Sequence, residues 1–229
     1  MGQEKEPVGW VTVNGNHVPI FEGESKEDAV ARSIGNNEDK KNEQIAKNKK
    51  QADKLNGKKS VSEDELKSQS TDWWYNKLSD SERKVILDAQ YSTKSVNEYL
   101  RGARKLDGSA KSDMEETVHT LDSALSKFKT DSDIVTYRGV NSEEFTNTYL
   151  GISPKTVGIK SSSYAKSRAE AFAKNQGGYI IEYHIKAGNH GADVNGVPGA
   201  NESEFLIRHN MTQKVIAKPD KNTIIVVVG

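Results

Sequence analysis

The sequence contains no cysteine among its 229 residues. It can therefore form no disulfide, offer no thiolate nucleophile and build no cysteine-ligated zinc or iron–sulfur site. The formal net charge is zero, because 33 Lys and Arg residues balance 33 Asp and Glu residues. This balance gives no electrostatic reason to expect nucleic acid or an anionic membrane as a partner. The absence of cysteine is compatible with any compartment and identifies none.

The motifs of several enzyme classes are also missing. No G-x-S-x-G, P-loop or G-x-G-x-x-G motif occurs. The histidines are scattered, and none is paired at metal-ligand spacing: His17, His119, His184, His190 and His209. Hydrolase triads, phosphoryl transfer and zinc catalysis therefore lack their usual signals, and we expect no metal.

No apolar run approaches the length of a signal-peptide core or of a membrane span. The opening stretch MGQEKEPVGW is polar, and Gly2 lacks the downstream Ser or Thr of a myristoylation signal. We therefore expect a chain without a signal peptide or transmembrane segment.

Residues 1–65 differ in composition from the rest of the chain. GWVTVNGNHVPIF, from Gly9 to Phe21, alternates apolar and polar residues around an Asn14-Gly15 turn signal and predicts a short β-hairpin. From Glu22 onward the sequence is rich in Lys, Asn and Glu and poor in aromatic residues, so it can bury little of a core. We predict a polar appendage and linker over residues 1–65 and a catalytic domain over residues 66–229.

The period of the apolar residues changes along that domain. Residues 72–129 have helical spacing, and Asp80 or Ser81 is the expected cap of one helix. The apolar stripes of three helices are Val85, Ile86 and Ala89; Val96, Tyr99 and Leu100; and Val118, Leu121, Leu125 and Phe128. The later runs DIVTYRGV, GYIIEYHIKA, EFLIRH, QKVIAK and NTIIVVVG are typical strands, and SYAKSRAEAFAKN is a helical patch among them. The order predicts an α+β domain with helices packed on a sheet.

Three short stretches carry candidate chemistry. TYRGV places Arg138 on a strand, where a guanidinium suits bidentate capture of a phosphate or carboxylate, and Gly139 allows close approach to a ligand. IKSSSYA offers three adjacent hydroxyls, a pattern that on its own more often forms a turn or a helix cap than a site. In NESEFLIRH, Glu202 and Glu204 lie on the same side of one strand, so their carboxylates repel each other. That repulsion favours a functional reason for the pair.

In this order the stretches resemble the Arg-Ser-Glu pattern of mono-ADP-ribosyltransferases. The likeness is strongest to bacterial exoenzyme-type transferases, which include the actin-modifying binary toxins and the C3-like enzymes. Asn-x-x-Leu-Arg, from Asn97 to Arg101, and Phe172 within AFAK extend the resemblance over residues 72–229. Two positions depart from the family: the hydroxyl triplet reads Ser-Ser-Ser rather than Ser-Thr-Ser, and Asn175 stands where some members have an arginine.

The resemblance implies an ADP-ribosyltransferase-like fold, with a helical N-terminal half packed on a two-sheet β core that encloses an NAD cleft. It also implies a reaction in which NAD loses nicotinamide and ADP-ribose passes to a protein side chain. A carboxylate complements the oxocarbenium-like sugar of such a transition state. By resemblance Glu204 has this role, while Glu202 engages the acceptor and favours an arginine. NAD is then a substrate, and no metal takes part.

The remaining site residues are also assigned by resemblance. Arg138 holds the phosphates of NAD, with Arg101 as a second phosphate contact and Asn97 nearby. The backbone of Gly139 meets the nicotinamide carboxamide, Phe172 stacks on the ring, and Ser161 donates a hydrogen bond to Glu204. The Gly-rich loop GADVNGVPGAN, residues 191–201, is the expected target-recognition loop.

Other functions fit the same residues. An NAD glycohydrolase would use water as the acceptor, and a C3-like transferase would act on small GTPases. A phage-particle protein could keep the fold without catalysis. Our leading expectation is a monomeric toxin or effector whose partner is a protein that presents an arginine, with actin as one candidate.

Overall fold

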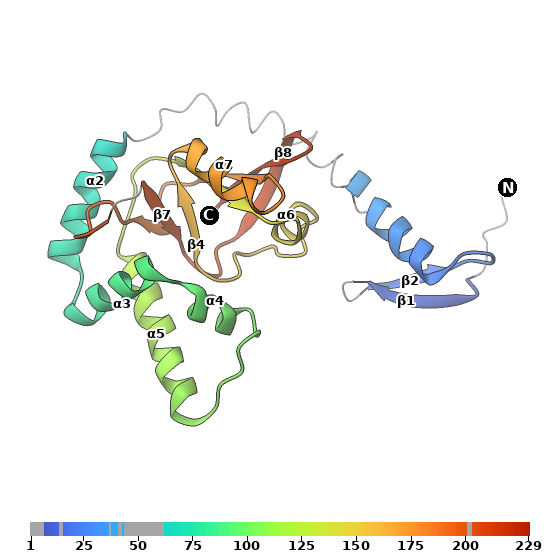
Figure 1. The fold of residues 1–229 in the computed structure, drawn as a ribbon, viewed down its shortest axis with the longest axis horizontal. Coiled ribbons are helices and arrows are strands. Elements are labelled where there is room, and N and C mark those ends of the chain that lie inside the picture. Colours follow the sequence, from blue (N-terminus) through green and yellow to red (C-terminus); the bar gives the residue numbers. More distant parts are fainter. Residues whose placement is uncertain (1–6, 14–15, 37, 41–42, 44–61, 201–202) are drawn as a thin grey trace.

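The computed structural model describes residues 7–13, 16–36, 38–40, 43, 62–200 and 203–229 (Figure 1). Near the N-terminus, β1 (Gly9–Val13) and β2 (Asn16–Ile20) pair antiparallel, and helical residues 26–36 follow them. Val18, Ile20 and Ala29 form a small core between the two strands and this helix. The expected Asn14-Gly15 turn lies outside the described residues. We refer to residues 7–40 as the hairpin unit.

The helical block begins with α2 (Glu63–Asp72), which continues directly into the π-helix η1 (Trp73–Lys77). Next come α3 (Asp80–Tyr91), α4 (Lys94–Leu100) and α5 (Gly108–Ser126). The expected cap of α3 at Asp80 or Ser81 is wrong. Ser79 is the cap, because its hydroxyl accepts a hydrogen bond from the Glu82 amide while the Glu82 carboxylate accepts one from the Ser79 amide.

The strands after this block form one seven-stranded sheet with the order β6-β7-β4-β3-β5-β9-β8. Its strands are β3 (Ile134–Val140), β4 (Lys160–Ser163), β5 (Tyr179–Ile185), β6 (Gly191–Asp193), β7 (Glu204–Ile207), β8 (Gln213–Asp220) and β9 (Thr223–Val228). All neighbours are antiparallel except β5 and β9, which run parallel. The α+β class is confirmed. The two-sheet core implied by the family resemblance is present as two parts of this one sheet, β6-β7-β4 and β3-β5-β9-β8. The single pair Tyr137–Ser163 joins the two parts.

Two helices lie between the strands in sequence. Helix α6 (Ser142–Tyr149) follows β3 directly and is capped by the Asn141 side chain, which accepts from the Glu144 amide. Helix α7 (Lys166–Lys174) corresponds to the helical patch expected from the sequence. The sequence patterns predict neither α6 nor β6. The first contains Thr and Asn, which are weak helix formers, and the second has only three residues.

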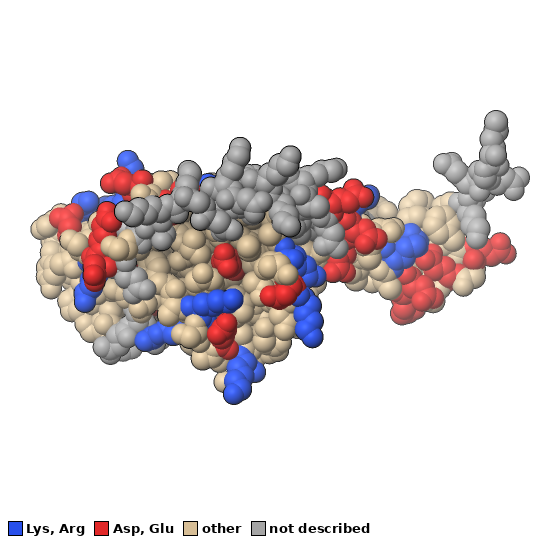
Figure 2. Space-filling view, turned by 90° about the horizontal axis from the view of Figure 1, so that it is seen from above, with Lys and Arg blue, Asp and Glu red and all other residues tan. Residues whose placement is uncertain are grey.

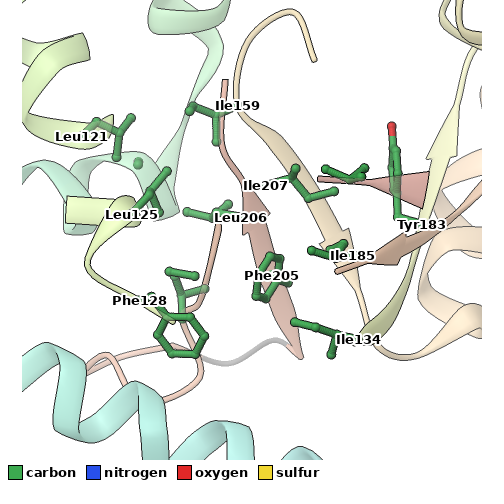
Figure 3. Packing of buried hydrophobic residues seen from close by; sticks show 14 of the residues in the cluster. Leu121, Leu125, Phe128, Ile134, Ile159, Tyr183, Ile185, Phe205, Leu206 and Ile207 are labelled. Carbon is green, nitrogen blue, oxygen red and sulfur yellow. The ribbon is translucent and has the colours of Figure 1, made fainter. Parts of the chain in front are cut away.

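The main hydrophobic core lies between the helical block and the sheet. Figure 3 shows Leu121 and Leu125 of α5, with Phe128 just after it, on one side and the β7 residues Phe205, Leu206 and Ile207 on the other. The rings of Phe128 and Phe205 meet edge to face, with centroids 6.2 Å apart. This packing fixes β7, the strand that begins with Glu204, against the helices.

The surface carries both signs of charge. On the face seen in Figure 2, Lys, Arg, Asp and Glu are interspersed over the domain that the helical block and the sheet form. An ion pair connects the sheet to the hairpin unit, because the Nζ of Lys218 in β8 lies 3.3 Å from Oε1 of Glu38. None of the helices in the described part of the chain is long and apolar enough to cross a membrane.

Candidate active site

The sheet separates between β3 and β4. Beyond the pair Tyr137–Ser163, the same register would bring Gly139 opposite Ser161, but no such pair forms. Instead, Nη1 of Arg138 donates to the Ser161 carbonyl oxygen at 2.8 Å. A cavity of about 210 Å³ opens here, which we call the Glu204 cavity. It is lined by Tyr137, Arg138, Gly139, Ser161, Ser162, Ser163, Arg168, Ala169, Ala171, Phe172, Ser203 and Glu204.

Glu204 lies in this cavity at the first position of β7. Ser163 pairs with Glu204 across β4 and β7, so Ser161 lies diagonally opposite on the same face. The hydroxyl of Ser161 donates to Oε1 of Glu204, which is the contact expected from the sequence. The Glu204 amide also donates to Oδ1 of Asn195, at 3.4 Å. The Ser161 contact orients the carboxylate, whereas the Asn195 contact holds the backbone at the start of β7. Glu202, its expected companion, lies outside the described residues.

Arg138 is held from a second side by Glu144, near the start of α6. The Nε and Nη2 atoms of Arg138 lie 3.2 and 3.3 Å from the two carboxylate oxygens. The Nζ of Lys160 reaches the same carboxylate, 2.5 Å from Oε1. Burial raises the pKa of Glu144, but Arg138 and Lys160 outweigh it and lower the pKa to about 2. The carboxylate is therefore ionised, and the guanidinium expected to bind phosphate is pre-oriented by a protein anion.

Gly139 is required by the packing of α7. A Cβ added there would collide with the Ala169 carbonyl oxygen, lie 2.7 Å from the Ala173 nitrogen and lie 3.0 Å from the Phe172 Cβ. The sequence suggested that Gly139 allows a ligand to approach closely. In the structure, it is α7 that approaches β3 closely at this glycine. The close approach places α7 along the Glu204 cavity. The Phe172 side chain is 66% exposed at the cavity rim, so its ring has a free face.

Asn97 and Arg101 do not line the Glu204 cavity. The side chain of Asn97 holds the segment before β4, because Oδ1 accepts from the Ile159 amide at 2.7 Å and Nδ2 donates to the Ile159 carbonyl at 3.0 Å. Arg101 lines a second cavity of about 240 Å³, which we call the Lys160 cavity. Its lining is Arg101, Asn141, Glu143, Glu144, Asn147, Thr148, Ser153, Val157, Lys160 and Gln213.

The first half of the expected target-recognition loop is fixed to the helical block. Residues 191–193 form β6, and Val194 and Val197 are buried in the core. The hydroxyl of Ser70 in α2 donates to the Asp193 carbonyl at 2.6 Å and accepts from the Gly196 amide at 3.0 Å. In the described part of this loop, Pro198 and Gly199 are solvent-exposed.

Five of the expected residues thus meet in one cavity, and Asn97 and Arg101 lie beside it. Sequence reasoning missed Glu144, Lys160 and Arg168. Only Arg168 had a signal, since it precedes Phe172 by four residues and shares its helix face. Within the described residues, no group of three or more His, Asp or Glu side chains is placed to hold a metal ion.

The chain resembles known proteins in sequence and in fold. A relative from Enterococcus faecalis (strain ATCC 700802 / V583), named NAD(+)--arginine ADP-ribosyltransferase EFV, is 34% identical over 129 residues, which are 52% of this chain and 25% of that protein. BECa, the ADP-ribosylating toxin of a binary enterotoxin of C. perfringens, was solved with NADH and has a TM-score of 0.58 at 23% identity, covering 72% of this chain and 46% of its own. The Clostridium limosum C3 exoenzyme has a TM-score of 0.57 at 18% identity, covering 75% of this chain and 97% of its own.

These likenesses have different weight. The two solved structures confirm the expected ADP-ribosyltransferase-like fold. The chain spans about a quarter of the Enterococcus protein and about half of BECa. The sequence profile of the ADP-ribosyltransferase exoenzyme family matches residues 63–228, which is most of the chain. The chain therefore belongs to the ADP-ribosyltransferase exoenzyme family.

Proposed function

We propose that the domain after the hairpin unit is an arginine-directed mono-ADP-ribosyltransferase that uses NAD as the donor. The observation that carries this proposal is the Glu204 carboxylate, held by the Ser161 hydroxyl in a cavity that Arg138 and Phe172 also line. The sequence profile of the family and the name of the Enterococcus relative support the reaction class and the acceptor.

In the proposed reaction, the bond between nicotinamide and C1′ of the ribose breaks, and its electron pair leaves with neutral nicotinamide. Positive charge develops on the sugar as this bond lengthens. The Glu204 carboxylate stabilises that charge, and the fixed hydrogen bond from Ser161 means that little reorganisation is needed. The exposed ring of Phe172 offers a stacking surface for the nicotinamide.

The acceptor step needs a second group. A guanidinium nitrogen of the target arginine forms a bond to C1′ and loses one proton. The arginine is a poor nucleophile because it remains protonated at neutral pH, so a carboxylate beside it must orient it and take that proton. We assign this role to Glu202, two residues before Glu204 in the sequence. Arg138 would contact the phosphates of NAD with its outward side, while Glu144 and the Ser161 carbonyl hold its inner side.

The target is proposed to be a protein that presents an exposed arginine, and actin is one candidate. A secreted or delivered toxin is the role we propose, in keeping with the toxins among the structural neighbours. We also propose that the transferase acts as a monomer. The later part of the loop before Glu204 and the rim of the Glu204 cavity are the surfaces that such a target would meet.

The experiment compares Glu204→Gln with Glu202→Gln and measures nicotinamide release and ADP-ribose incorporation into agmatine. Glu204→Gln should reduce both rates by about 10² or more, as for other lost electrostatic contacts to a transition state. Glu202→Gln should abolish incorporation and spare much of the hydrolysis. The matched control Glu116→Gln, on an exposed part of α5, should change neither rate.

The outcomes separate the alternatives. Retained hydrolysis in Glu204→Gln would refute the assignment of the site. Equal loss of both rates in Glu202→Gln would refute the division of roles. Nicotinamide release without transfer to any arginine compound would make the protein an NAD glycohydrolase, and the absence of both activities would favour a non-catalytic protein.

A further inference from the structure

Lys160 is a buried lysine whose side chain forms an ion pair with Glu144. It is 7% exposed at the first position of β4, and its Nζ lies 2.5 Å from Oε1 of Glu144. An unpaired buried ammonium would be costly, and even a paired one seldom stabilises a fold more than an apolar residue of the same size. The presence of this lysine therefore invites a reason beyond stability.

The carboxylate that Lys160 contacts is shared with Arg138. Glu144 accepts from Nε and Nη2 of Arg138 through both of its oxygens. If Arg138 and Glu144 were alone, their charges would cancel, and the pair would attract an anion only weakly. Lys160 adds one positive charge beside the same carboxylate, so the formal charges of the three side chains add up to +1.

The three side chains lie in the wall between the two cavities. Arg138 lines the Glu204 cavity, whereas Glu144 and Lys160 line the Lys160 cavity. Arg101 adds a further cation to the lining of the Lys160 cavity, and Glu143 there is solvent-exposed, so its charge is screened. The rest of that lining is mainly amide and hydroxyl side chains: Asn141, Asn147, Thr148, Ser153 and Gln213.

We propose that Lys160 is a binding residue for the diphosphate of NAD, which it attracts by restoring the positive charge that Glu144 removes from Arg138. This inference rests on the proposed function, because it names a residue that binds the same donor. Glu144 then has two effects on Arg138, because it orients the guanidinium and also cancels its positive charge. Lys160 offsets the second effect. The diphosphate would then bind where Arg138 lines the Glu204 cavity, and Lys160 would attract it through the net charge of the three side chains.

A purely structural role for Lys160 makes a different prediction. If the lysine only satisfies Glu144, then a neutral side chain that still donates a hydrogen bond should replace it without loss of NAD affinity. If its charge matters, the same replacement should weaken NAD binding, and removing the charge of Glu144 as well should restore it. The net charge of the three positions is +1 in the wild type, 0 in Lys160→Gln and +1 again in Lys160→Gln with Glu144→Gln.

The experiment measures affinity by calorimetry for NAD, for ADP-ribose and for nicotinamide. Lys160→Gln should weaken NAD and ADP-ribose by about 10- to 100-fold, the size of a lost interaction with a charged group, and leave nicotinamide unchanged. The double variant should recover most of the lost affinity. The matched control is Lys186→Gln, whose lysine pairs with Asp133 at 3.1 Å and lines neither cavity, and it should bind like the wild type.

Thermal melts of each variant show that the comparison is between folded proteins. Should Lys160→Gln fail to fold, the isosteric Lys160→Met with Glu144→Gln removes the buried pair completely and tests the same charge balance against Glu144→Gln alone. Wild-type affinity in folded Lys160→Gln, or a double variant as weak as the single one, would overturn the proposal. A wild-type protein that binds neither NAD nor ADP-ribose would instead refute the proposed function.

Discussion

Gly139→Ala should loosen the fold and the site together, because the added methyl group has no space. It would collide with the Ala169 carbonyl oxygen and lie 2.7 Å from the Ala173 nitrogen, and both are backbone atoms of α7. A flexible side chain could move aside, but a helix backbone can only shift as a unit. Overpacking of this kind costs about 1–3 kcal/mol. For a domain of this size, each kcal/mol lowers Tm by about 2–4 °C, so we expect a loss of roughly 2–12 °C.

The same shift should reach the ligand. The Cβ of Phe172 would lie 3.0 Å from the new methyl carbon, and Phe172 and Arg168 both line the Glu204 cavity. Displacing α7 should therefore weaken NAD binding as well as stability. Differential scanning calorimetry and NAD titration measure the two effects. The control is Gly35→Ala, because a Cβ there meets no atom within 4 Å. Unchanged melting and unchanged NAD affinity in Gly139→Ala would refute the packing argument.

Three other predictions concern buried and terminal features of the domain. Glu144 has a folded pKa of about 2 against an ordinary 4.5, so it should contribute about 3 kcal/mol of stability above pH 4.5 that is lost as the pH falls toward 2; acid titration of Glu144→Gln should show a flatter slope across that window. The Tyr183 hydroxyl is buried and has no hydrogen-bond partner among the described residues, so Tyr183→Phe should be neutral or stabilising by up to about 3 kcal/mol in urea denaturation, and a clear loss of stability would contradict this prediction. A chain that starts at Ser62 keeps the cap of α2 and the buried Leu66, so it should retain a cooperative melt and NAD binding, whereas insolubility would mean that residues 1–61 are part of the fold.

The sequence predicts the parts of the site that depend on the period of one element. The helical spacing around Phe172 predicts α7 correctly. Periodicity describes which side of a strand or helix a residue occupies, and for this helix that was enough. The hydrogen bond from Ser161 to Glu204, which the structure contains, is expected from the family resemblance and not from the period of a strand.

Periodicity does not say which residue of another element will be met there. Glu144 lies in a stretch where the sequence predicts no helix, and the direct connection from β3 to α6 brings it to Arg138. Lys160 reads as a surface residue, because lysine is seldom buried, and its partner comes from that same helix. Asn97 lies in the expected motif, yet its two hydrogen bonds to Ile159 give it a contact that the motif alone does not describe.

The parallel pairing of β5 with β9 has a consequence for how the chain folds. Strand β9 lies inside the sheet, between β5 and β8, although it follows every other described strand in the sequence. During synthesis the edge of β5 therefore has no partner until residues 223–228 have been made. Until then it presents an open row of amide and carbonyl groups, which favours pairing with other chains. Completion of the sheet should therefore be a late step, and variants that weaken β9 should aggregate before they lose activity.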